Sequence, residues 1–313
     1  MDTTETQRLI NGCQQLNEIL SRIEAQLDNM LKLVAGYSGE TKLPDTENAS
    51  PSPEPCPVPS TVIPTLVFYC FGPFRVFKND QLVGNWNGQK GQLILKYLIA
   101  HVGKPVSKEK LMDALWPEAD PESARRNLHQ AVYSLRHTLK TNNHERQYIL
   151  FQNECYLLNP DVEIWVDVMA FEAHIRSGRD QENRGNMAAA INAYALAEGL
   201  YQGGFIEDEP YADWADPKRQ QFQHLYLETA NKLSQHYFQQ KQYTAAVSQC
   251  QRILLVDNCY EPAHCLLIEC YLAQGQRHMA VRQYQACVQA LKETLGLPPS
   301  EKTRLIYRQL IST

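Results

Sequence analysis

A spacing of 34 residues recurs in the second half of this 313-residue chain. The matched positions are Leu233 and Leu267, Ser234 and Ile268, Tyr237 and Tyr271, Ala246 and Ala280, Cys250 and Tyr284, and Ile253 and Cys287. Small side chains at fixed points let two helices approach closely, and large ones fill the groove beside them. A 34-residue period is that of tetratricopeptide helix pairs, so the spacing predicts an α-helical repeat array.

A third copy of the pattern stands further upstream. Ala190, Tyr194 and Ala197 lie 56 residues before Ala246 and its two partners, and an insertion around 203–214 accounts for the excess. Such arrays have a concave surface and usually bind proteins or peptides.

The aromatic residues of this region divide into two groups. We expect Tyr237 and Tyr271 to belong to the core of the repeats. Tyr211 and Trp214 fall in the insertion, so they are candidates for contact with another domain or with a partner.

The segment 121–140 has the strongest functional pattern. Its apolar stripe at helical spacing is Leu128, Val132, Leu135 and Leu139, and the opposite stripe is Arg126, His129, Gln130, Tyr133, Arg136, His137 and Lys140. This polar stripe holds no carboxylate, and Glu122 lies at the helix start, where its charge is favourable. Arg, Gln and His can bond base edges, so the major groove of double-stranded DNA is the leading partner. The alternative is a solvated amphipathic helix without a ligand.

The neighbouring segments favour DNA binding. Strands are expected at 66–71 and 74–77, helices at 89–102 and 108–116, and a hairpin of 148–151 with 156–158. Ser107 is the expected N-cap of the second helix, and Pro121 suits the first turn of the third. Strands, three helices and a hairpin in this order predict a winged helix-turn-helix.

Residues 65–160 resemble the winged-helix effector domain of response regulators. They are more similar to the same domain in the antibiotic-regulatory-protein family of bacterial activators. The resemblance is carried by FGPFRV (71–76), LKYLIAHVGKPVSKEKLMDALWP (95–117) and SARRNLHQAVYSLRHTL (123–139). The turn 152–155 departs from the family's glycine-rich wing, although Asn153 tolerates a left-handed backbone.

Residues 161–313 resemble the bacterial transcriptional activator domain that follows the winged helix in that family. The matching positions are Trp165, Asp167, Phe171, 200–205, Asp213, Trp214, 261–264, Gln283, Tyr284 and 295–300. Both resemblances together cover about four-fifths of the chain and occur in the family's order.

The resemblance implies roles for several residues. Arg126, His129, Gln130 and Tyr133 match groove-facing positions, Arg125 and Arg136 match phosphate contacts, and the other DNA-contact candidates are His137, Lys140 and Asn153. The family joins its two domains with almost no linker, and 159–167 is equally short. We therefore expect Trp165 and Phe171 to bury against the winged helix.

The first 64 residues are a separate feature. A heptad seam runs through Leu9, Cys13, Leu16, Leu20, Ile23, Leu27, Met30 and Val34. It predicts a coiled-coil helix over 1–35 that forms a homo-oligomer, with docking on its own chain as the alternative. Residues 36–64 are rich in proline and predict a flexible linker.

Charge and motifs restrict the class of protein. Residues 61–160 have a net charge of +4, whereas 1–60 and 161–313 have −5 and −4, so only the winged helix is basic. The nine cysteines show neither a C-x-x-C pair nor zinc spacing, so no metal or other cofactor is expected. Phosphate-loop, G-x-S-x-G and H-E-x-x-H motifs are absent, so no enzyme is expected. Without a signal peptide or a long apolar run, the sequence predicts a cytoplasmic protein away from membranes.

The sequence predicts a mostly α protein with a small β component and four segments: 1–35, 36–64, 65–160 and 161–313. Its predicted function is sequence-specific DNA binding in transcription, as an activator, with RNA polymerase or another regulatory protein as a further candidate partner. The alternative is a tetratricopeptide adaptor that binds a protein and uses its winged helix for protein contact or nonspecific DNA tethering.

Overall fold

The computed structural model describes residues 66–84, 86, 88–140 and 147–312. The predicted heptad seam and proline-rich linker lie outside these ranges. The described chain is mostly α-helical with small β-sheets, and its helical repeats and winged helix confirm the predicted fold class. No helix in the described ranges is both long and apolar enough to cross a membrane.

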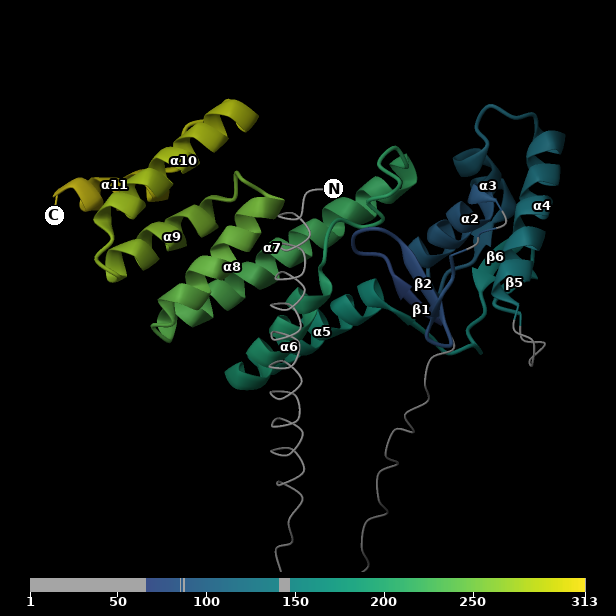
Figure 1. Cartoon of the computed structure of the whole chain (residues 1–313), viewed down its shortest axis with the longest axis horizontal. Coiled ribbons are helices and arrows are strands. Elements are labelled where there is room, and N and C mark those ends of the chain that lie inside the picture. Colours follow the sequence, from purple (N-terminus) through teal and green to yellow (C-terminus); the bar gives the residue numbers. More distant parts are fainter. Residues whose placement is uncertain (1–65, 85, 87, 141–146, 313) are drawn as a thin grey trace, which may run out of the picture. The chain divides into compact units, whose positions relative to one another are not determined.

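The first part of the described chain has the predicted order of strands, three helices and a hairpin (Figure 1). Its elements are β1 (Leu66–Tyr69), β2 (Arg75–Lys78), β3 (Gln81–Leu82), α2 (Gln89–Ala100), β4 (Val106–Ser107), α3 (Lys108–Leu115), α4 (Pro121–Leu139), β5 (Ile149–Gln152) and β6 (Cys155–Leu158). β2 pairs antiparallel with β1 and with β3. This is the predicted winged helix-turn-helix.

Local signals set the ends of the helices. The Ser107 hydroxyl accepts a hydrogen bond from the Lys110 backbone N–H at 3.3 Å, as expected of an N-cap. Asp120 caps α4 by accepting from the Ser123 N–H at 3.0 Å, and Pro121 is the first helical residue. Buried apolar stripes then hold both helices against the core. The stripe of α4 is buried as predicted, at Leu128, Val132, Leu135 and Leu139.

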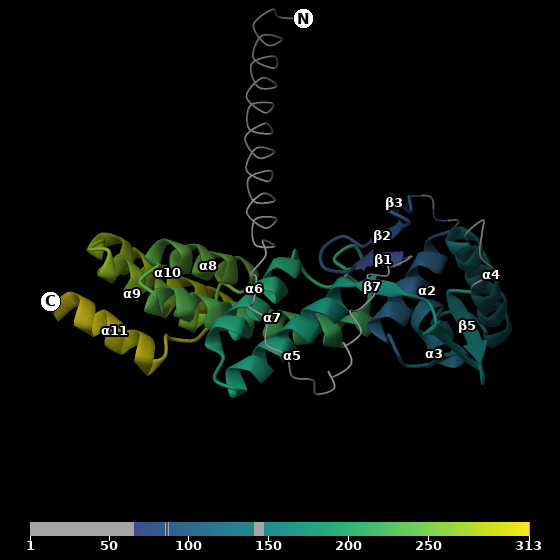
Figure 2. The same ribbon diagram turned by 90° about the horizontal axis from the view of Figure 1, so that it is seen from below.

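The sequence missed three short strands of this part, which are β3, β4 and β7. β4 is a two-residue strand that pairs antiparallel with β6, so the hairpin becomes a three-stranded sheet in the order β4-β6-β5. β7 (Ile164–Val166) comes from the predicted junction and pairs parallel with β1, with Val67 opposite Trp165 (Figure 2). The four-stranded sheet β3-β2-β1-β7 therefore crosses the expected domain boundary at residue 160.

Helix pairs make up the rest of the described chain (Figure 1). They are α5 (Asp167–Asn183), α6 (Met187–Leu200), the short 3-10 helix η1 (Asp213–Ala215), α7 (Asp216–Gln239), α8 (Tyr243–Val256), α9 (Glu261–Ala273), α10 (Arg277–Leu295) and α11 (Glu301–Ser312). Helices α5 and α6 pack together, as do α7 and α8, and α9 and α10. Ala190, Ala246 and Ala280 are fully buried at equivalent places, which supports the predicted repeat. Tyr271 is buried and Tyr237 half-buried, both in the core as expected.

The turn inside each helix pair shows the same repeat. Gly185, Lys241 and Gly275 have φ angles of 78°, 58° and 72°, and their spacings are the 56 and 34 residues of the sequence pattern. A left-handed backbone favours glycine because it has no Cβ. Lys241 therefore holds a position where its neighbours in the array use glycine.

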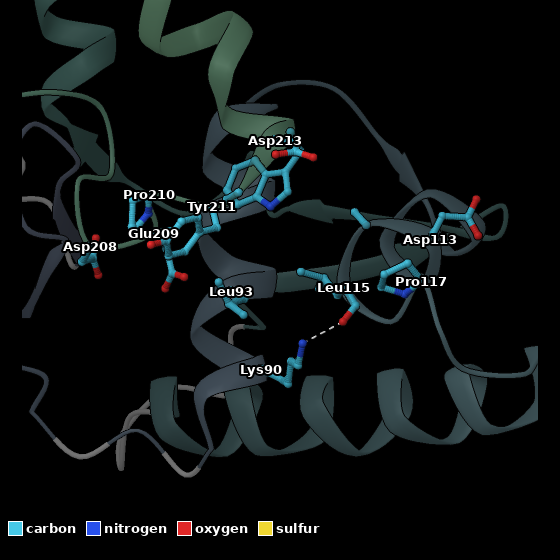
Figure 3. A pocket seen from close by; sticks show the side chains of 13 residues that line it. Lys90, Leu93, Asp113, Leu115, Pro117, Asp208, Glu209, Pro210, Tyr211 and Asp213 are labelled. Carbon is cyan, nitrogen blue, oxygen red and sulfur yellow. Dashed lines mark hydrogen bonds between the residues drawn. The ribbon is translucent and has the colours of Figure 1, made fainter.

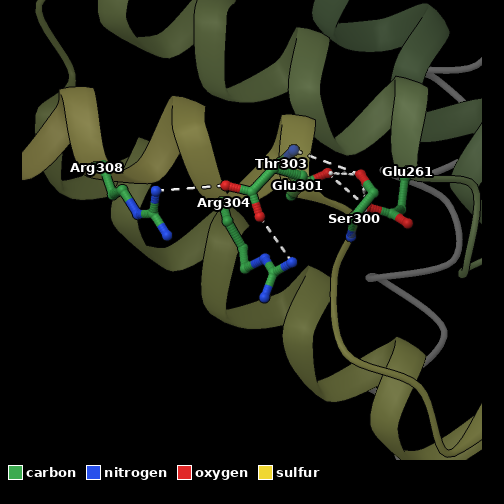
Figure 4. Close-up of polar contacts among 6 residues, drawn as sticks. All are labelled: Glu261, Ser300, Glu301, Thr303, Arg304 and Arg308. Atoms are coloured by element: carbon green, nitrogen blue, oxygen red, sulfur yellow. Dashed lines mark hydrogen bonds and ion pairs between the residues drawn. The ribbon is translucent and has the colours of Figure 1, made fainter.

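The last helix, α11, is held at its start by one carboxylate (Figure 4). Glu261 Oε2 accepts hydrogen bonds from the Ser300 N–H at 2.9 Å, from the Ser300 hydroxyl at 2.8 Å and from the Thr303 hydroxyl. Further along α11, Tyr307 stacks on Tyr284 at 3.9 Å between ring centroids. Glu261 thus connects the first turn of α9 to the cap of α11.

Acid is expected to loosen α11. Burial alone raises the pKa of Glu261, but the hydrogen bonds from Thr303 and Ser300 outweigh it and lower the pKa below its ordinary value. A carboxylate with a depressed folded pKa stabilises the folded state above its unfolded pKa, near 4.3, and that stabilisation is lost as pH falls through the folded value. We expect hydrogen exchange of α11 amides, corrected for intrinsic rates, to accelerate below about pH 4. Glu261→Gln should lose protection already at neutral pH and show a flatter pH profile; an unchanged profile contradicts this role.

Candidate nucleic-acid interface

Helix α4 presents a polar face opposite its buried stripe. Arg125, His129, Gln130 and His137 are exposed, and the side chain of Tyr133 is 74% exposed. A Tyr this accessible in the middle of a helix contributes little to the core, whereas it can pack on a nucleic-acid backbone. Lys140 is exposed at the C-cap, where its backbone carbonyl accepts a hydrogen bond from the Lys78 ammonium. The face is thus available to a ligand along the length of the helix.

The two other arginines of this face are held by local hydrogen bonds. Arg126 donates to the Ser123 hydroxyl at 2.8 Å, on the same side of the helix, and its side chain stays 70% exposed. Arg136 is half-buried and donates to the Ile149 carbonyl from Nε at 3.2 Å and from Nη2 at 2.9 Å. The guanidinium that the family pattern assigns to phosphate therefore also connects α4 to β5.

The wing is a tight turn between β5 and β6. Asn153 and Glu154 both have left-handed backbones, with φ of 49° and 60°, as a two-residue hairpin of this twist requires. Asn153 is exposed at the tip. The Glu154 carboxylate pairs with the Lys108 ammonium at the start of α3. The hydrogen bond and charge of Lys108 lower the pKa of Glu154, with a smaller contribution from Arg125, against a small opposing effect of desolvation.

The polar face of α4, the start of α3 and the wing form the candidate interface. In a helix-turn-helix domain the recognition helix enters the major groove and the preceding helix crosses the DNA backbone, and these are the roles expected here of α4 and α3. Of its side chains, Lys108 was not among the sequence candidates. The signal was present, since Lys108 follows the N-cap Ser107, but the pairing of β4 with β6 that brings it to the wing was not predicted.

Two family models match the chain. The model described as "Transcriptional regulatory protein, C terminal" matches residues 88–154, which contain α2 to β5 and the wing. The model described as "Bacterial transcriptional activator domain" matches residues 166–311, from the end of β7 into α11. The pair occurs in the order that the sequence predicted.

The chain is an antibiotic-regulatory-protein-like transcriptional regulator.

Solved structures are similar to this regulator in fold. Mycobacterium tuberculosis EmbR, in complex with a low affinity phosphopeptide, matches with a TM-score of 0.67 and 20% identity over 79% of this chain and 65% of that one. The regulator thus spans about two thirds of the EmbR chain. The tetratricopeptide domain of Arabidopsis OM64 covers 47% of this chain and 98% of its own, at 12% identity and a TM-score of 0.33. No curated protein sequence matches the regulator.

The junction between the regulator's two domains buries aromatic residues. Phe171, on α5, is fully buried, and its ring lies 5.1 Å from that of Phe71, which follows β1. Trp165 is half-buried, with its ring 5.4 Å from Tyr69. Trp214 of η1 lies 5.0 Å from Tyr97 of α2. Phe171, Trp165 and Trp214 are therefore contacts between the domains.

Tyr211 is different, because its side chain is 95% exposed. It lines a cavity of about 660 Å³ between α2, α3 and the segment 208–214 (Figure 3). On the winged-helix side of the cavity, Lys90 donates to the Leu115 carbonyl at 2.7 Å. Among the aromatic residues predicted to contact another domain or a partner, Tyr211 is thus the one whose ring is accessible to a partner.

Two buried ionic groups complete the junction, and neither their burial nor their partners were predicted from the sequence. Asp167 accepts from the backbone N–H groups of Cys70 at 2.7 Å and Phe71 at 2.9 Å. Burial raises the pKa of Asp167, while these hydrogen bonds act in the opposite direction. Lys96 of α2 is inaccessible to solvent and pairs with Asp208 at 2.5 Å and Glu209 at 2.7 Å. Each group belongs to one domain and is satisfied by the other.

Proposed function

We propose that this regulator binds a specific sequence in double-stranded DNA with α4 in the major groove and activates transcription. The observation that supports this most directly is the exposed face of α4, where Gln130 and His129 stand between Arg125 and Tyr133. Side chains of these types bond base edges, and the flanking cations and the wing contact phosphates. In this proposal residues 65–160 bind DNA and residues 161–313 form the activator domain, although β7 of the second segment completes a sheet of the first.

Replacing Gln130 with Ala tests base reading. The cognate site is first selected from random DNA with the wild-type protein. Gln130→Ala is then expected to cost roughly 1–3 kcal/mol on that site and to relax preference at one base position, because a base-edge hydrogen bond is lost. Fluorescence anisotropy on cognate and random DNA measures both effects.

Arg125→Ala is the matched control. This exposed residue offers a cation to phosphate, so its loss should weaken cognate and random DNA about equally. Arg136→Ala is a poorer control than the sequence suggested, because it also removes the hydrogen bonds to the Ile149 carbonyl. Equal losses on both DNAs for Gln130→Ala would contradict direct readout by α4.

Protein binding by the repeats is the second candidate function. It is supported by the exposed ring of Tyr211 beside the cavity at the junction, and RNA polymerase or another regulatory protein is the class of partner that activation requires. The salt dependence of binding distinguishes the two functions. The affinity for DNA should fall steeply as the salt concentration rises, and the affinity for the specific site should remain much higher than that for random DNA. Homo-oligomerisation through the seam Leu9–Val34 is proposed from the sequence alone, and sedimentation with and without residues 1–60 tests it.

A further inference from the structure

The wing tip carries a carboxylate on a surface that has to approach DNA phosphates. Glu154 is the second residue of the turn, and its side chain is 63% exposed. The negative charge of Glu154 at the wing tip repels the phosphates of DNA unless a nearby cation neutralises it. The residues around Glu154 identify this cation.

Sheet register brings the wing to the start of α3. Ser107 of β4 lies opposite Cys155 of β6, and the Lys108 backbone N–H donates to the Glu154 carbonyl at 3.0 Å. The same two residues are joined by their side chains, because the Lys108 ammonium bonds the Glu154 carboxylate. The Lys108 side chain is only 19% exposed, and Glu109 lies 4.0 Å from its ammonium. The Lys108 ammonium is therefore held by carboxylates of its own chain.

Two elements meet at this pair, the start of α3 and the wing. The charge of Arg125, on α4, makes a further small contribution to the lowered pKa of Glu154. In a winged helix that reads DNA through α4, the elements beside the recognition helix meet the phosphate backbone. Lys108 has the position of a phosphate contact, but its partner in the free protein is Glu154.

We propose that Glu154 competes with a DNA phosphate for Lys108 and so removes one backbone contact from the regulator. This inference rests on the proposed DNA-binding function. In the wild-type complex Lys108 then makes no phosphate contact, whatever the DNA sequence, although its charge would permit one. The internal carboxylate lowers the overall affinity of each protomer and leaves base preference unchanged, so stable occupancy depends more on a second protomer or partner.

An exposed ion pair without such a role is the competing explanation. Pairs of this kind commonly contribute little to stability. Removal of any acid from a DNA-binding surface also raises affinity somewhat through long-range charge. The test must therefore separate direct competition from a general charge effect, and the coupling between Glu154 and Lys108 does so.

The experiment measures DNA affinity of the full chain for wild type, Glu154→Gln, Lys108→Gln and the double variant. Glu118→Gln is the matched control, since Glu118 is an exposed acid of the same domain in the turn before α4. We expect Glu154→Gln to tighten binding about three- to tenfold at 50 mM salt, equally on cognate and random DNA. Lys108→Gln alone should change DNA affinity little, because Lys108 is already paired with Glu154. In the double variant, Lys108→Gln should abolish the increase in affinity that Glu154→Gln produces. Glu118→Gln should give a smaller gain without dependence on Lys108.

Salt provides a second reading of the same contact. One added phosphate contact steepens the slope of log K against log salt by about 0.9, so the gain of Glu154→Gln should shrink about 3.5-fold between 50 and 200 mM salt. Equal effects of Glu154→Gln and Glu118→Gln, or equal losses from Lys108→Gln in both backgrounds, would overturn the proposal.

The outcomes separate this inference from the proposed function. If wild type fails to distinguish cognate from random DNA, base reading by α4 is wrong, yet the coupling is still measured on random DNA. If discrimination is present and the coupling is absent, only the role of Glu154 is wrong. A chain that binds neither DNA contradicts both.

Discussion

Removal of both carboxylates that hold Lys96, by Asp208→Asn with Glu209→Gln, is expected to lower the free energy of unfolding by about 3–5 kcal/mol. The Lys96 side chain is inaccessible to solvent, so its ammonium cannot exchange its partners for water. An uncompensated buried charge is among the most destabilising single changes in a protein. Chemical denaturation of wild type and variant, followed by circular dichroism, measures the loss.

Lys96→Met is the control with the opposite expectation. It removes the buried charge, and its apolar side chain lies near Phe74, whose ring is 5.3 Å from the Lys96 ammonium. Asp208 and Glu209 are 35% and 29% exposed and can be hydrated in its absence. Lys96→Met should therefore cost clearly less than the double carboxylate change. If Lys96→Met destabilises as much as the double change, the buried charge is not the cause.

Phe171→Ala is expected to cost about 3–5 kcal/mol, the range for a fully buried Phe. Its ring lies among Phe71, Tyr201 and Phe222, at 5.1, 6.1 and 6.2 Å between centroids. Phe71 comes from the winged-helix segment and the other two from the activator domain, so the cavity would open at the junction. DNA binding should weaken as well, because the orientation of the winged helix on the repeats is loosened.

Two controls bracket the effect of Phe171→Ala. Phe171→Leu retains most of the apolar volume and should cost about 1.5 kcal/mol or less. Tyr211→Ala removes an equally large aromatic ring that is 95% exposed, so stability should change by no more than about 0.5 kcal/mol. Similar losses for Phe171→Ala and Tyr211→Ala would show that burial at the junction is not what stabilises the chain.

The elements that the sequence predicted are those with local signals. The stripe of Leu128, Val132, Leu135 and Leu139 has helical spacing, and Pro121 marks the start of α4. The 34-residue recurrence can be recognised in a single sequence. The left-handed turn inside each helix pair repeats with it, even at Lys241, where the other two pairs have glycine. Periodicity and capping are properties of neighbouring residues, so a single chain shows them directly.

What the sequence did not predict depends on distant partners. β7 has three residues, too few for a period, and exists because β1 offers it an edge. Lys96 and Asp167 look like ordinary surface charges, since their partners lie 112 and 97 residues away. In the candidate interface, the residue type of Arg136 suggested a phosphate contact, whereas its hydrogen bonds to the Ile149 carbonyl could be found only in three dimensions.

The parallel pairing of β7 with β1 has a consequence for biosynthesis. The winged-helix segment leaves the ribosome before the strand that completes its sheet, and before the loop that carries Asp208 and Glu209. Domains fold as units as the chain emerges, so this first unit stays incomplete until the start of the second has been translated. A nascent or prematurely terminated chain that ends before residue 208 lacks the anchors of Lys96, and we expect it to be degraded rather than to occupy operators in competition with the finished protein. We therefore expect the DNA-binding half to complete its fold only after the start of the activator half has been synthesised.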